Sequence, residues 1–358
     1  MSTAAALDHD TANQLLEDMV RTRSHSGEEG AIAALLVERM LALGFDRAEV
    51  DAAGNAVGHL GDGPRRLVLL GHMDTVPGEV PIRRCGDLLY GRGTVDAKGP
   101  LATFVAAAAR AGARPGWTLT VVGAVEEEAP TSKGARHVAP LWRPEACVIG
   151  EPSGWDAVTL GYKGRLLCEY RYRQGLAHSA GASRSAAELG VSFWNSVVEA
   201  GEALNEGQER VFDQLSPTLL AINSQDDGLH EEVALTISWR TPLWFERQPW
   251  EEKLGLLAGE EAELRFYGGE VAYRGGKSNP LVRAFLAALR EQGAKPRFKV
   301  KTGTADLNIV GPAWGCPILA YGPGDSSLDH TPDEHISLGE YWKAILVLQG
   351  AIEGLTAP

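Results

Sequence analysis

The sequence predicts an α/β protein in which a sheet is covered by helices on both faces and is interrupted by an inserted α+β domain. Its 358 residues are about twice the length of a usual domain, so two domains are expected. Short apolar runs alternate with helical patterns in residues 1–161, and this alternation resumes over residues 276–358. Residues 162–275 have instead the texture of half-buried strands and long helices. We therefore expect a discontinuous first domain and a self-contained insert.

Each element follows from hydrophobic spacing; the second helix, for example, has apolar residues at helical intervals from Ile32 and stops at Gly44. In the first domain the expected elements are helices at 6–23 and 28–43, a strand at 66–71, an alanine-rich helix at 98–113, strands at 118–124 and 146–150, a helix at 281–290, a strand at 318–321 and a helix at 339–352. In the insert they are a strand at 166–173, a helix at 183–204, strands at 219–224 and 233–240, a helix at 250–258 and a strand at 263–266.

Composition excludes several classes of protein. The net charge of −13 argues against a broad nucleic-acid footprint and against binding to an anionic membrane surface. Because the chain has neither a membrane-length apolar run nor a signal-like start in residues 1–10, we expect a cytoplasmic protein. The four cysteines form no C-x-x-C pair, so buried reduced thiols are expected rather than disulfides or a cysteine zinc site.

Five short segments concentrate the ionisable side chains, and we expect them just after predicted strands, where open α/β sheets place their sites. They are residues 71–74, 91–99, 126–128, 150–153 and 329–335. His72 and Asp74 are two residues apart, so an extended backbone points both to one face, where a carboxylate can hold the imidazole of a metal-bound histidine. Alone, this spacing also fits a surface histidine near a turn.

The other segments are ambiguous when taken singly. Asp96 stands at the entrance to the alanine-rich helix, where it could cap the helix or bridge two metal ions. Residues 126–128 are three adjacent glutamates, which repel one another unless a cation or a proton lies among them. A charge run is usually a solvated face, but this one follows an apolar strand. Glu151 also follows a buried strand, and His330 lies in a loop before the last helix.

Together the segments supply two imidazoles and at least three carboxylates, a ligand set that suits paired divalent ions. Zinc is the expected metal, and cobalt or manganese would also fit. Two such ions leave room for a shared water of lowered pKa and a glutamate that takes its proton, which is the chemistry of an amide hydrolase. The motifs of serine hydrolases and nucleotide-binding enzymes do not follow any predicted strand.

In this order the five segments resemble the dinuclear zinc deacylase and exopeptidase family, which includes acetylornithine deacetylase, succinyl-diaminopimelate desuccinylase and glutamate carboxypeptidases. The resemblance implies a zinc-peptidase-like mixed sheet with an inserted lid and dimerisation domain, and hence a homodimer. It implies that the metal ligands are His72, Asp96, Glu128, Glu151 and His330, with Asp96 bridging. Asp74 would orient His72, and Glu127 would be the general base; a shift of base and ligand to Glu126 and Glu127 stays open.

The resemblance also assigns residues of the insert. His178, in residues 177–180, matches a histidine that in relatives reaches the partner subunit's site and stabilises the oxyanion; without the family it would be taken as a turn or interface histidine. Lys163 and Arg240 match cationic groups that bind the substrate carboxylate. Gly303 and Thr304 match a backbone loop that holds the same carboxylate. Two departures from the family pattern concern the insert, at Ser238 and at residues 229–232.

Within the family, residues 127–136, 150–164 and 301–308 are most similar to members that release lysine, and in some cases ornithine, from the C-terminal glutamate γ-carboxyl of a small acidic amino-group carrier protein. Four cations alternate near residue 300 and would line one face of a strand: Lys295, Arg297, Lys299 and Lys301. They could receive an acidic partner or simply protect an edge strand. The alternatives are a small-molecule deacylase acting on acetylornithine or succinyl-diaminopimelate, and a non-catalytic protein that binds amino-acid conjugates.

Overall fold

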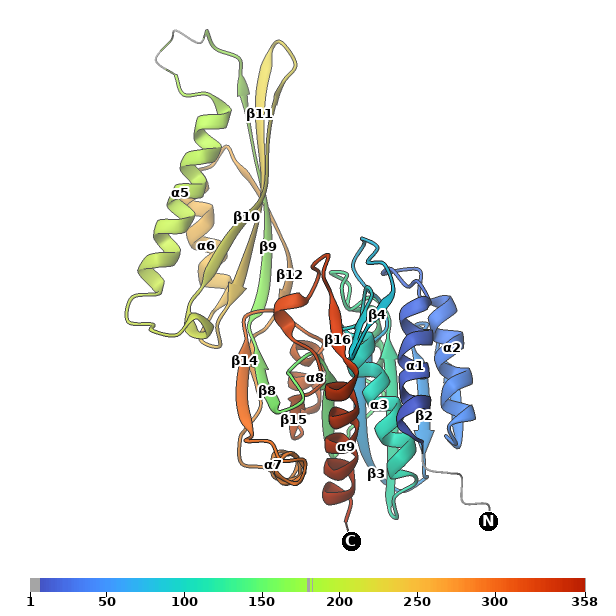
Figure 1. Ribbon diagram of the computed structural model, residues 1–358. Coiled ribbons are helices and arrows are strands. Elements are labelled where there is room, and N and C mark those ends of the chain that lie inside the picture. Colours follow the sequence, from blue (N-terminus) through green and yellow to red (C-terminus); the bar gives the residue numbers. More distant parts are fainter. Residues whose placement is uncertain (1–6, 179–180, 182, 358) are drawn as a thin grey trace. The chain divides into compact units, whose positions relative to one another are not determined.

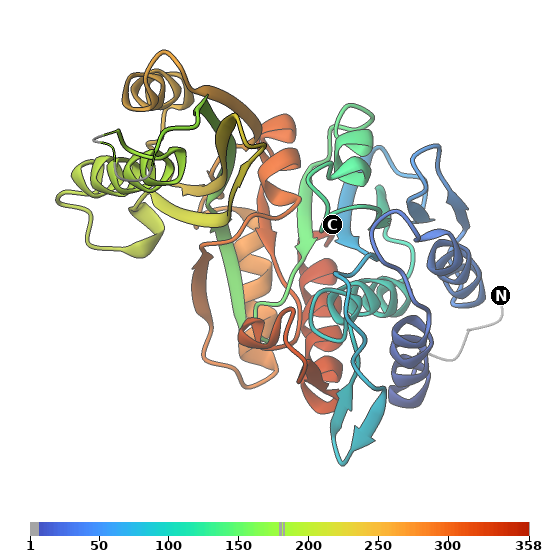
Figure 2. The same ribbon diagram turned by 90° about the horizontal axis from the view of Figure 1, so that it is seen from above.

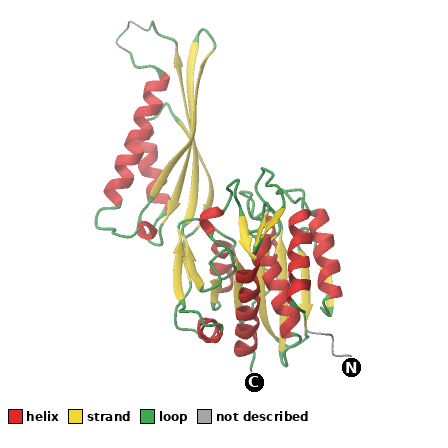
Figure 3. Ribbon diagram, in the orientation of Figure 1, coloured by secondary structure: helices red, strands yellow, loops and turns green. Residues whose placement is uncertain are grey.

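The computed structural model describes residues 7–178, 181 and 183–357. By its internal contacts the chain divides into two compact units. Unit 1 consists of Met1–Gly161, Arg274–Val300 and Ala305–Pro358, and unit 2 of Tyr162–Tyr273 and Lys301–Thr304. Each unit has its own sheet and its own helices (Figures 1 and 3).

Unit 1 is built on a mixed sheet with the strand order β1-β2-β6-β3-β7-β15-β8-β13, in which β14 also pairs with β8. The strands are β1 (Arg47–Val50), β2 (Ala56–Leu60), β3 (Arg65–His72), β6 (Trp117–Ala124), β7 (Ala146–Gly150), β8 (Ala157–Tyr162), β13 (Tyr273–Arg274), β14 (Arg297–Lys301) and β15 (Ile318–Ala320). The central strands β6, β3, β7 and β15 are parallel, so their carboxyl ends lie at one edge. A small second sheet pairs β16 (His335–Ser337) with β5 (Leu88–Tyr90), which pairs with β4 (Arg83–Cys85).

Helices cover both faces of this sheet (Figure 2). One face packs in a single apolar core against α1 (His9–Arg21), α2 (Gly30–Ala42), α3 (Lys98–Ala111), α7 (Pro280–Glu291) and α9 (Leu338–Leu355). The helices α4 (Lys133–Val138) and α8 (Leu307–Trp314) contact each other and strands β6 and β15 on the other side. Leu67 and Leu69 of β3 belong to the first core, whereas the alternate residues Val68 and Leu70 point to the opposite face.

The alanine-rich helix α3 positions the beginning of the site. Its residues are buried without interruption from Lys98 to Ala108, because small side chains let it lie between the sheet and α9. Gly99 allows the first turn to approach the preceding loop closely, since a Cβ there would lie 2.3 Å from the Thr94 carbonyl oxygen. The loop that carries Asp96 is thereby packed directly against the helix start.

Unit 2 is an antiparallel sheet of order β10-β11-β9-β12 with helices on one face. Its elements are β9 (Gly164–Gly175), α5 (Ala186–Leu204), β10 (Ser216–Asp226), β11 (His230–Thr241), α6 (Arg247–Ala258) and β12 (Glu263–Glu270). Tyr170 of β9 stacks on Phe193 of α5 at 4.3 Å between ring centroids, and Trp239 meets Trp250 edge to face. Ser185 and Glu188 form a capping box at the start of α5.

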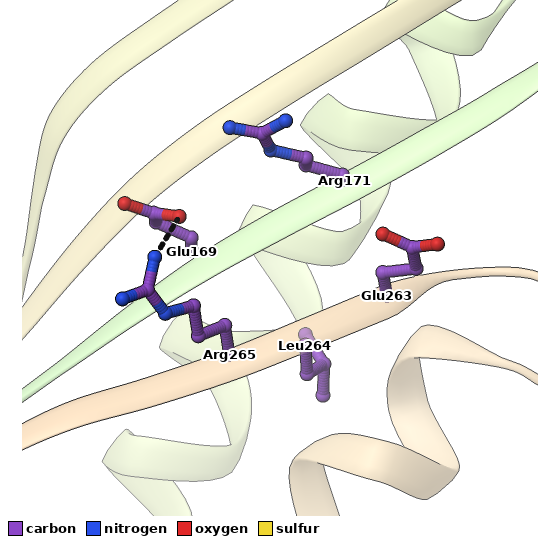
Figure 4. Close-up of a pocket in the computed structure, with 5 residues that line it drawn as sticks. All are labelled: Glu169, Arg171, Glu263, Leu264 and Arg265. Carbon is purple, nitrogen blue, oxygen red and sulfur yellow. Dashed lines mark ion pairs between the residues drawn. The ribbon is translucent and has the colours of Figure 1, made fainter.

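The face of this sheet away from the helices is charged (Figure 4). Glu169 and Arg171 on β9, with Glu263 and Arg265 on β12, line a cavity of about 540 Å³. Arg265 forms an ion pair with Glu169 at 3.8 Å. None of these four residues was a predicted site residue.

The predicted fold class is confirmed: the chain forms a mixed α/β sheet with helices. The long elements were predicted within a few residues, whereas β1, β2, β4, β5, β8, β13, β16, α4 and α8 were not. These elements have between two and eight residues, and most of them lack the continuous apolar run that predicted the equally short β7 and β15. Among the residues that the structure describes, no helix combines the length and the apolar character needed to cross a bilayer.

Candidate metal centre

His72 ends strand β3 and is held from one side by Asp74. Its Nδ1 lies 3.3 Å from Asp74 Oδ1 and 3.1 Å from the Asp74 carbonyl oxygen. Its Nε2 faces two other carboxylates, at 3.2 Å from Asp96 Oδ1 and 3.9 Å from Glu151 Oε1. At most 1% of the surface of His72 and of Asp74 is exposed, so the surrounding atoms fix this orientation of the ring. A histidine whose Nδ1 is anchored in this way presents Nε2 as a metal ligand.

Asp96 lies between the two histidines. Its Oδ1 faces His72 Nε2 at 3.2 Å, and its Oδ2 faces His330 Nε2 at 3.1 Å. His330 Nε2 also lies 2.9 Å from Glu128 Oε1. The two oxygens of one carboxylate thus serve two separate imidazoles, which is the geometry expected of a bridging ligand.

Potential ligand atoms gather in two sets that share Asp96. One set is His72, Asp96 and Glu151; the other is Asp96, Glu128 and His330. Within each set the ligand atoms lie within 4.8 Å of one another, and His72 also forms such a set with Glu127 and Glu128. All these residues belong to unit 1: His72 ends β3, and the others come from loops that follow β6 and β7 or precede α3 and β16.

The three consecutive glutamates have different environments. Glu126 accepts a hydrogen bond from Thr131 Oγ1 at 2.6 Å and pairs with Lys133 at 3.5 Å. Glu127 and Glu128 donate their backbone N–H groups to the two carboxylate oxygens of Asp74, each at 3.1 Å. Asp74 therefore orders the glutamate loop as well as His72, and Glu126 is the member of the run that is engaged elsewhere.

Electrostatics shows that the cluster needs positive charge. Burial raises the pKa of Glu127 well above its ordinary value, and Glu151 and Asp306 raise it further against the opposing effect of His72. Burial likewise raises the pKa of Glu128. Hydrogen bonds that His330 donates to the carboxylates of Asp96 and Glu128 raise the pKa of His330 to about 10.

Asp96 is affected in the opposite direction. Burial alone would raise its pKa, but hydrogen bonds with His330 and His72 lower the pKa below its ordinary value. Carboxylates outnumber imidazoles in this cluster, whose members other than His330 are buried or half-buried, so a proton or a cation must compensate them. The imidazole and carboxylate donors present are those that divalent zinc, cobalt or manganese accept, so the residues fit a metal centre.

Three supporting residues were not predicted from the sequence. Ser26 donates to Asp74 Oδ2 at 2.7 Å, Asp306 is buried close enough to raise the pKa of Glu127, and Glu334 accepts from the backbone of Asp96 at 3.2 Å. Only Glu334 lay in one of the five segments, so its position beside His330 was the available signal. Ser26 and Asp306 belong to loops that no spacing rule relates to His72.

The predicted substrate-binding residues gather within unit 2. Arg240 Nη1 donates to Thr304 Oγ1 at 2.9 Å, and Gly303 precedes Thr304 in the same loop. Lys163 is fully buried, and its Nζ donates to the carbonyl oxygens of Val211 and Gln214 and to Ser216 Oγ. Burial lowers the pKa of Lys163 to about 8. These bonds give Lys163 an anchoring role within unit 2, which the sequence did not predict.

His178 is exposed in the loop between β9 and α5, and residues 179 and 180 of its predicted motif lie outside the described residues. Its catalytic role stays a prediction.

The fold and the cluster together define a metal-dependent hydrolase of amide- or peptide-type bonds. Residues 68–354 match the family described as Peptidase family M20/M25/M40, and the chain belongs to this family. A relative from Deinococcus radiodurans named [LysW]-lysine hydrolase is 48% identical and aligns over 97% of this chain and 98% of its own. A relative from Thermococcus kodakarensis, named as a putative [LysW]-lysine/[LysW]-ornithine hydrolase, is 40% identical over 96% of this chain and 91% of its own.

Solved structures agree with the fold. The M20 family metallo-carboxypeptidase Sso-CP2 from Sulfolobus solfataricus superposes with a TM-score of 0.80 at 16% identity, covering 97% of this chain and 99% of its own. The aminopeptidase PepT from Bacillus cereus also gives 0.80 at 16% identity, covering 98% and 100%. The expected family resemblance is thereby confirmed.

Proposed function

We propose that this protein releases L-lysine, or L-ornithine in the same linkage, by hydrolysing its amide bond to the γ-carboxyl of the C-terminal glutamate of an amino-group carrier protein. The observation that carries the proposal is the 48% identity to a [LysW]-lysine hydrolase across 97% of the chain. A match of that extent includes both units, and so includes the metal cluster and the residues around Arg240.

The metal centre in this proposal holds two divalent ions, most simply zinc. His72, Asp96 and Glu151 would hold one, and Asp96, Glu128 and His330 the other. Such ions polarise an amide carbonyl and lower the pKa of water. The shared carboxylate of Asp96, with one oxygen toward each histidine, supports this arrangement.

Glu127 is the proposed general base. It would take a proton from the attacking water and return it to the leaving nitrogen, which becomes the α-amino group of lysine. Asp74 supports the role by fixing the backbone of Glu127 and the ring of His72. The side chain of Glu126, bonded to Thr131, favours this register over the alternative.

The substrate contacts belong to unit 2. Arg240 with Gly303 and Thr304 would bind the α-carboxylate of the released amino acid, since a guanidinium and a hydroxyl held 2.9 Å apart can both donate to one carboxylate. We further propose that unit 2 forms the interface of a homodimer and that His178 acts in the partner subunit's site. Exposed apolar side chains support an interface there, at Leu220 (57% exposed) and Ile222 (46%) on the edge strand β10.

The alternating cations near residue 300 contribute less to carrier binding than the sequence alone suggests. Arg297 donates to both oxygens of Asp156 at 2.7 and 2.8 Å, and Lys299 donates to the Ser153 carbonyl oxygen at 2.7 Å. Lys295 is exposed. Two of the four cations therefore have partners inside unit 1. In addition, β14 pairs with β8 but is not part of the continuous order of strands in the sheet, so its cations also fit the protection of an edge strand.

The test is amine release by the zinc-loaded protein at equal concentrations of carrier-linked lysine, carrier-linked ornithine, N-acetylornithine and succinyl-diaminopimelate. We expect kcat/KM at least about a hundredfold higher for the carrier conjugates, which corresponds to about 2.7 kcal/mol of transition-state binding. Comparable or faster turnover of the small acyl compounds would contradict the carrier function and indicate a general deacylase. Binding of the conjugates without any turnover would indicate a non-catalytic protein.

A further inference from the structure

Glu334 is a fully buried carboxylate, with 0% exposure, in the loop that also carries His330. The proposed reaction gives Glu334 no role. It belongs to neither set of proposed metal ligands, and it lies in unit 1, whereas the proposed substrate residues lie in unit 2. A buried carboxylate is unfavourable unless each oxygen has a partner, so its partners indicate what it does.

The partners of Glu334 lie in the loop that carries Asp96. Glu334 Oε1 accepts hydrogen bonds from the backbone N–H groups of Val95 at 2.9 Å and Asp96 at 3.2 Å. Its Oε2 accepts from Arg92 Nη1 at 2.8 Å, and its carbonyl oxygen accepts from Gly91 N at 3.2 Å. One side chain thus joins two segments that are 238 residues apart in sequence.

Arg92 strengthens the connection between the two loops. Its guanidinium also donates to the Thr331 carbonyl oxygen at 3.4 Å and to the Gly78 carbonyl oxygen at 2.9 Å. Arg92 and Glu334 are both largely buried, with side-chain exposures of 11% and 1%, so their ion pair is little screened by solvent. The ion pair, together with the bonds from the backbone N–H groups of Val95 and Asp96 to Glu334, connects residues 91–96 with residues 330–334.

The two ligand sets depend on this connection between the loops to different degrees. His72 ends β3 and Glu151 follows β7, and these two strands are hydrogen-bonded neighbours, so the sheet itself fixes the spacing of the two residues. Asp96 and His330 follow no strand of that sheet. Their loops adjoin the paired strands β5 and β16 of the small sheet, and beyond that pairing their spacing depends on contacts between the loops, several of which Glu334 supplies.

We propose that Glu334, together with Arg92, is a positioning residue that sets the distance between Asp96 and His330 and so determines the affinity of the ion held by Asp96, Glu128 and His330. The inference rests on the proposed metal centre. The ion held by His72, Asp96 and Glu151 should depend much less on Glu334, because two of its three ligands are placed by the sheet.

The experiment is a metal titration of the apo-protein with Zn²⁺ against a chromophoric chelator, for wild type and Glu334→Gln. The variant keeps an oxygen for the N–H groups but cannot accept from Arg92 on its amide nitrogen. We expect about a 10- to 100-fold loss of affinity for one ion, the same ion that His330→Ala weakens, and little change for the other. Equal loss at both ions, or unchanged affinities, would overturn the proposal.

Two further variants separate positioning from general destabilisation. Arg92→Lys keeps the charge but loses the fork of donors, and it should weaken the same ion even if Glu334→Gln fails to fold. Glu270→Gln is the matched control, since Glu270 is a buried carboxylate paired with Arg165 in unit 2. It should lower the thermal midpoint of the apo-protein without changing either metal affinity. Selective weakening by Glu270→Gln would contradict the inference.

The number of ions that the wild type binds separates a failure of the proposed metal centre from a failure of the role proposed for Glu334. A wild-type chain that binds fewer than two ions contradicts the proposed metal centre itself. A wild-type chain that binds two ions, with Glu334→Gln and Arg92→Lys indistinguishable from it, contradicts only the role of Glu334.

Discussion

The adjacent residues Glu126 and Glu127 have different surroundings, and they provide the sharpest prediction for single residues. We expect Glu127→Gln to retain the metal ions but to lower kcat by about 10² to 10⁴, because the amide cannot accept and return a proton. Activity is followed by amine release, and metal content by elemental analysis of the purified variant. A Glu127→Gln variant within about tenfold of wild type would refute the assignment of the general base.

Glu126→Gln is the control for this prediction, since it changes the adjacent side chain by the same single atom. Glu126 accepts from Thr131 and pairs with Lys133, so its replacement should leave kcat nearly unchanged. A large loss in Glu126→Gln with a small loss in Glu127→Gln would move the base by one residue.

The placement of side chains could be predicted from sequence where the relevant atoms are close along the chain. The spacing of His72 and Asp74 was enough to predict that both side chains lie together, as the 3.3 Å contact shows. The second function of Asp74, as acceptor for the backbone of the glutamate loop, depends on a loop 53 residues away. The anchoring of Lys163 by residues 48 to 53 positions later was equally hidden. Such contacts arise from tertiary packing, which local spacing does not encode.

At the level of elements, the junction between β8 and β9 depends on the buried Lys163. Because burial lowers its pKa to about 8, the folded protein releases this proton before the unfolded chain does, whose lysine pKa is near 10.4. Between these values the unfolded state binds more protons, so stability rises with pH. We expect the thermal midpoint to rise less between pH 8 and 10 in Lys163→Met than in wild type.

The size of this effect is bounded by one proton. The slope of the unfolding free energy against pH should differ between the two proteins by up to about 1.4 kcal/mol per pH unit. Lys98, whose pKa is also lowered by burial to about 8, is the same in both and cancels. Parallel profiles for the two proteins would show that Lys163 is not the group responsible.

The length and the apolar character of an element together decided whether it could be predicted, since the three apolar residues of β15 were expected as a strand and the three residues of β4 were not. The helix α3 was expected at 98–113 and spans Lys98–Ala111, because its alanine pattern continues over 14 residues. Strands such as β4 and β16 have only three residues each and are defined by pairing with β5, so hydrophobic alternation had no room to appear.

At the level of the whole molecule, the proposed metal ligands and the proposed substrate residues are divided between the two units. A ligand that binds only the folded state stabilises the part of the protein that binds it, by about 2.7 kcal/mol at a hundredfold excess over Kd. Chelation should therefore lower the hydrogen-exchange protection of β3, β7 and α3 in unit 1 while β9, β11 and α5 in unit 2 remain protected. Mass spectrometry of the exchanged peptides measures both units in one sample.

Restoring Zn²⁺ should return the protection of unit 1, which excludes damage by the chelator. Equal loss of protection in the two units would mean that their folding is coupled, so that the metal stabilises the entire chain.

The assignment of Lys301–Thr304 to unit 2 has a consequence for the history and engineering of this chain. The polypeptide passes between units after Gly161, Tyr273, Val300 and Thr304, so unit 2 is not one uninterrupted cassette. A recombination event that exchanged only residues 162–273 with a relative would separate Arg240 from the Thr304 hydroxyl that accepts its hydrogen bond. Chimaeras that transplant substrate preference should therefore carry both segments, and natural recombinants of this family are expected to have inherited the two together.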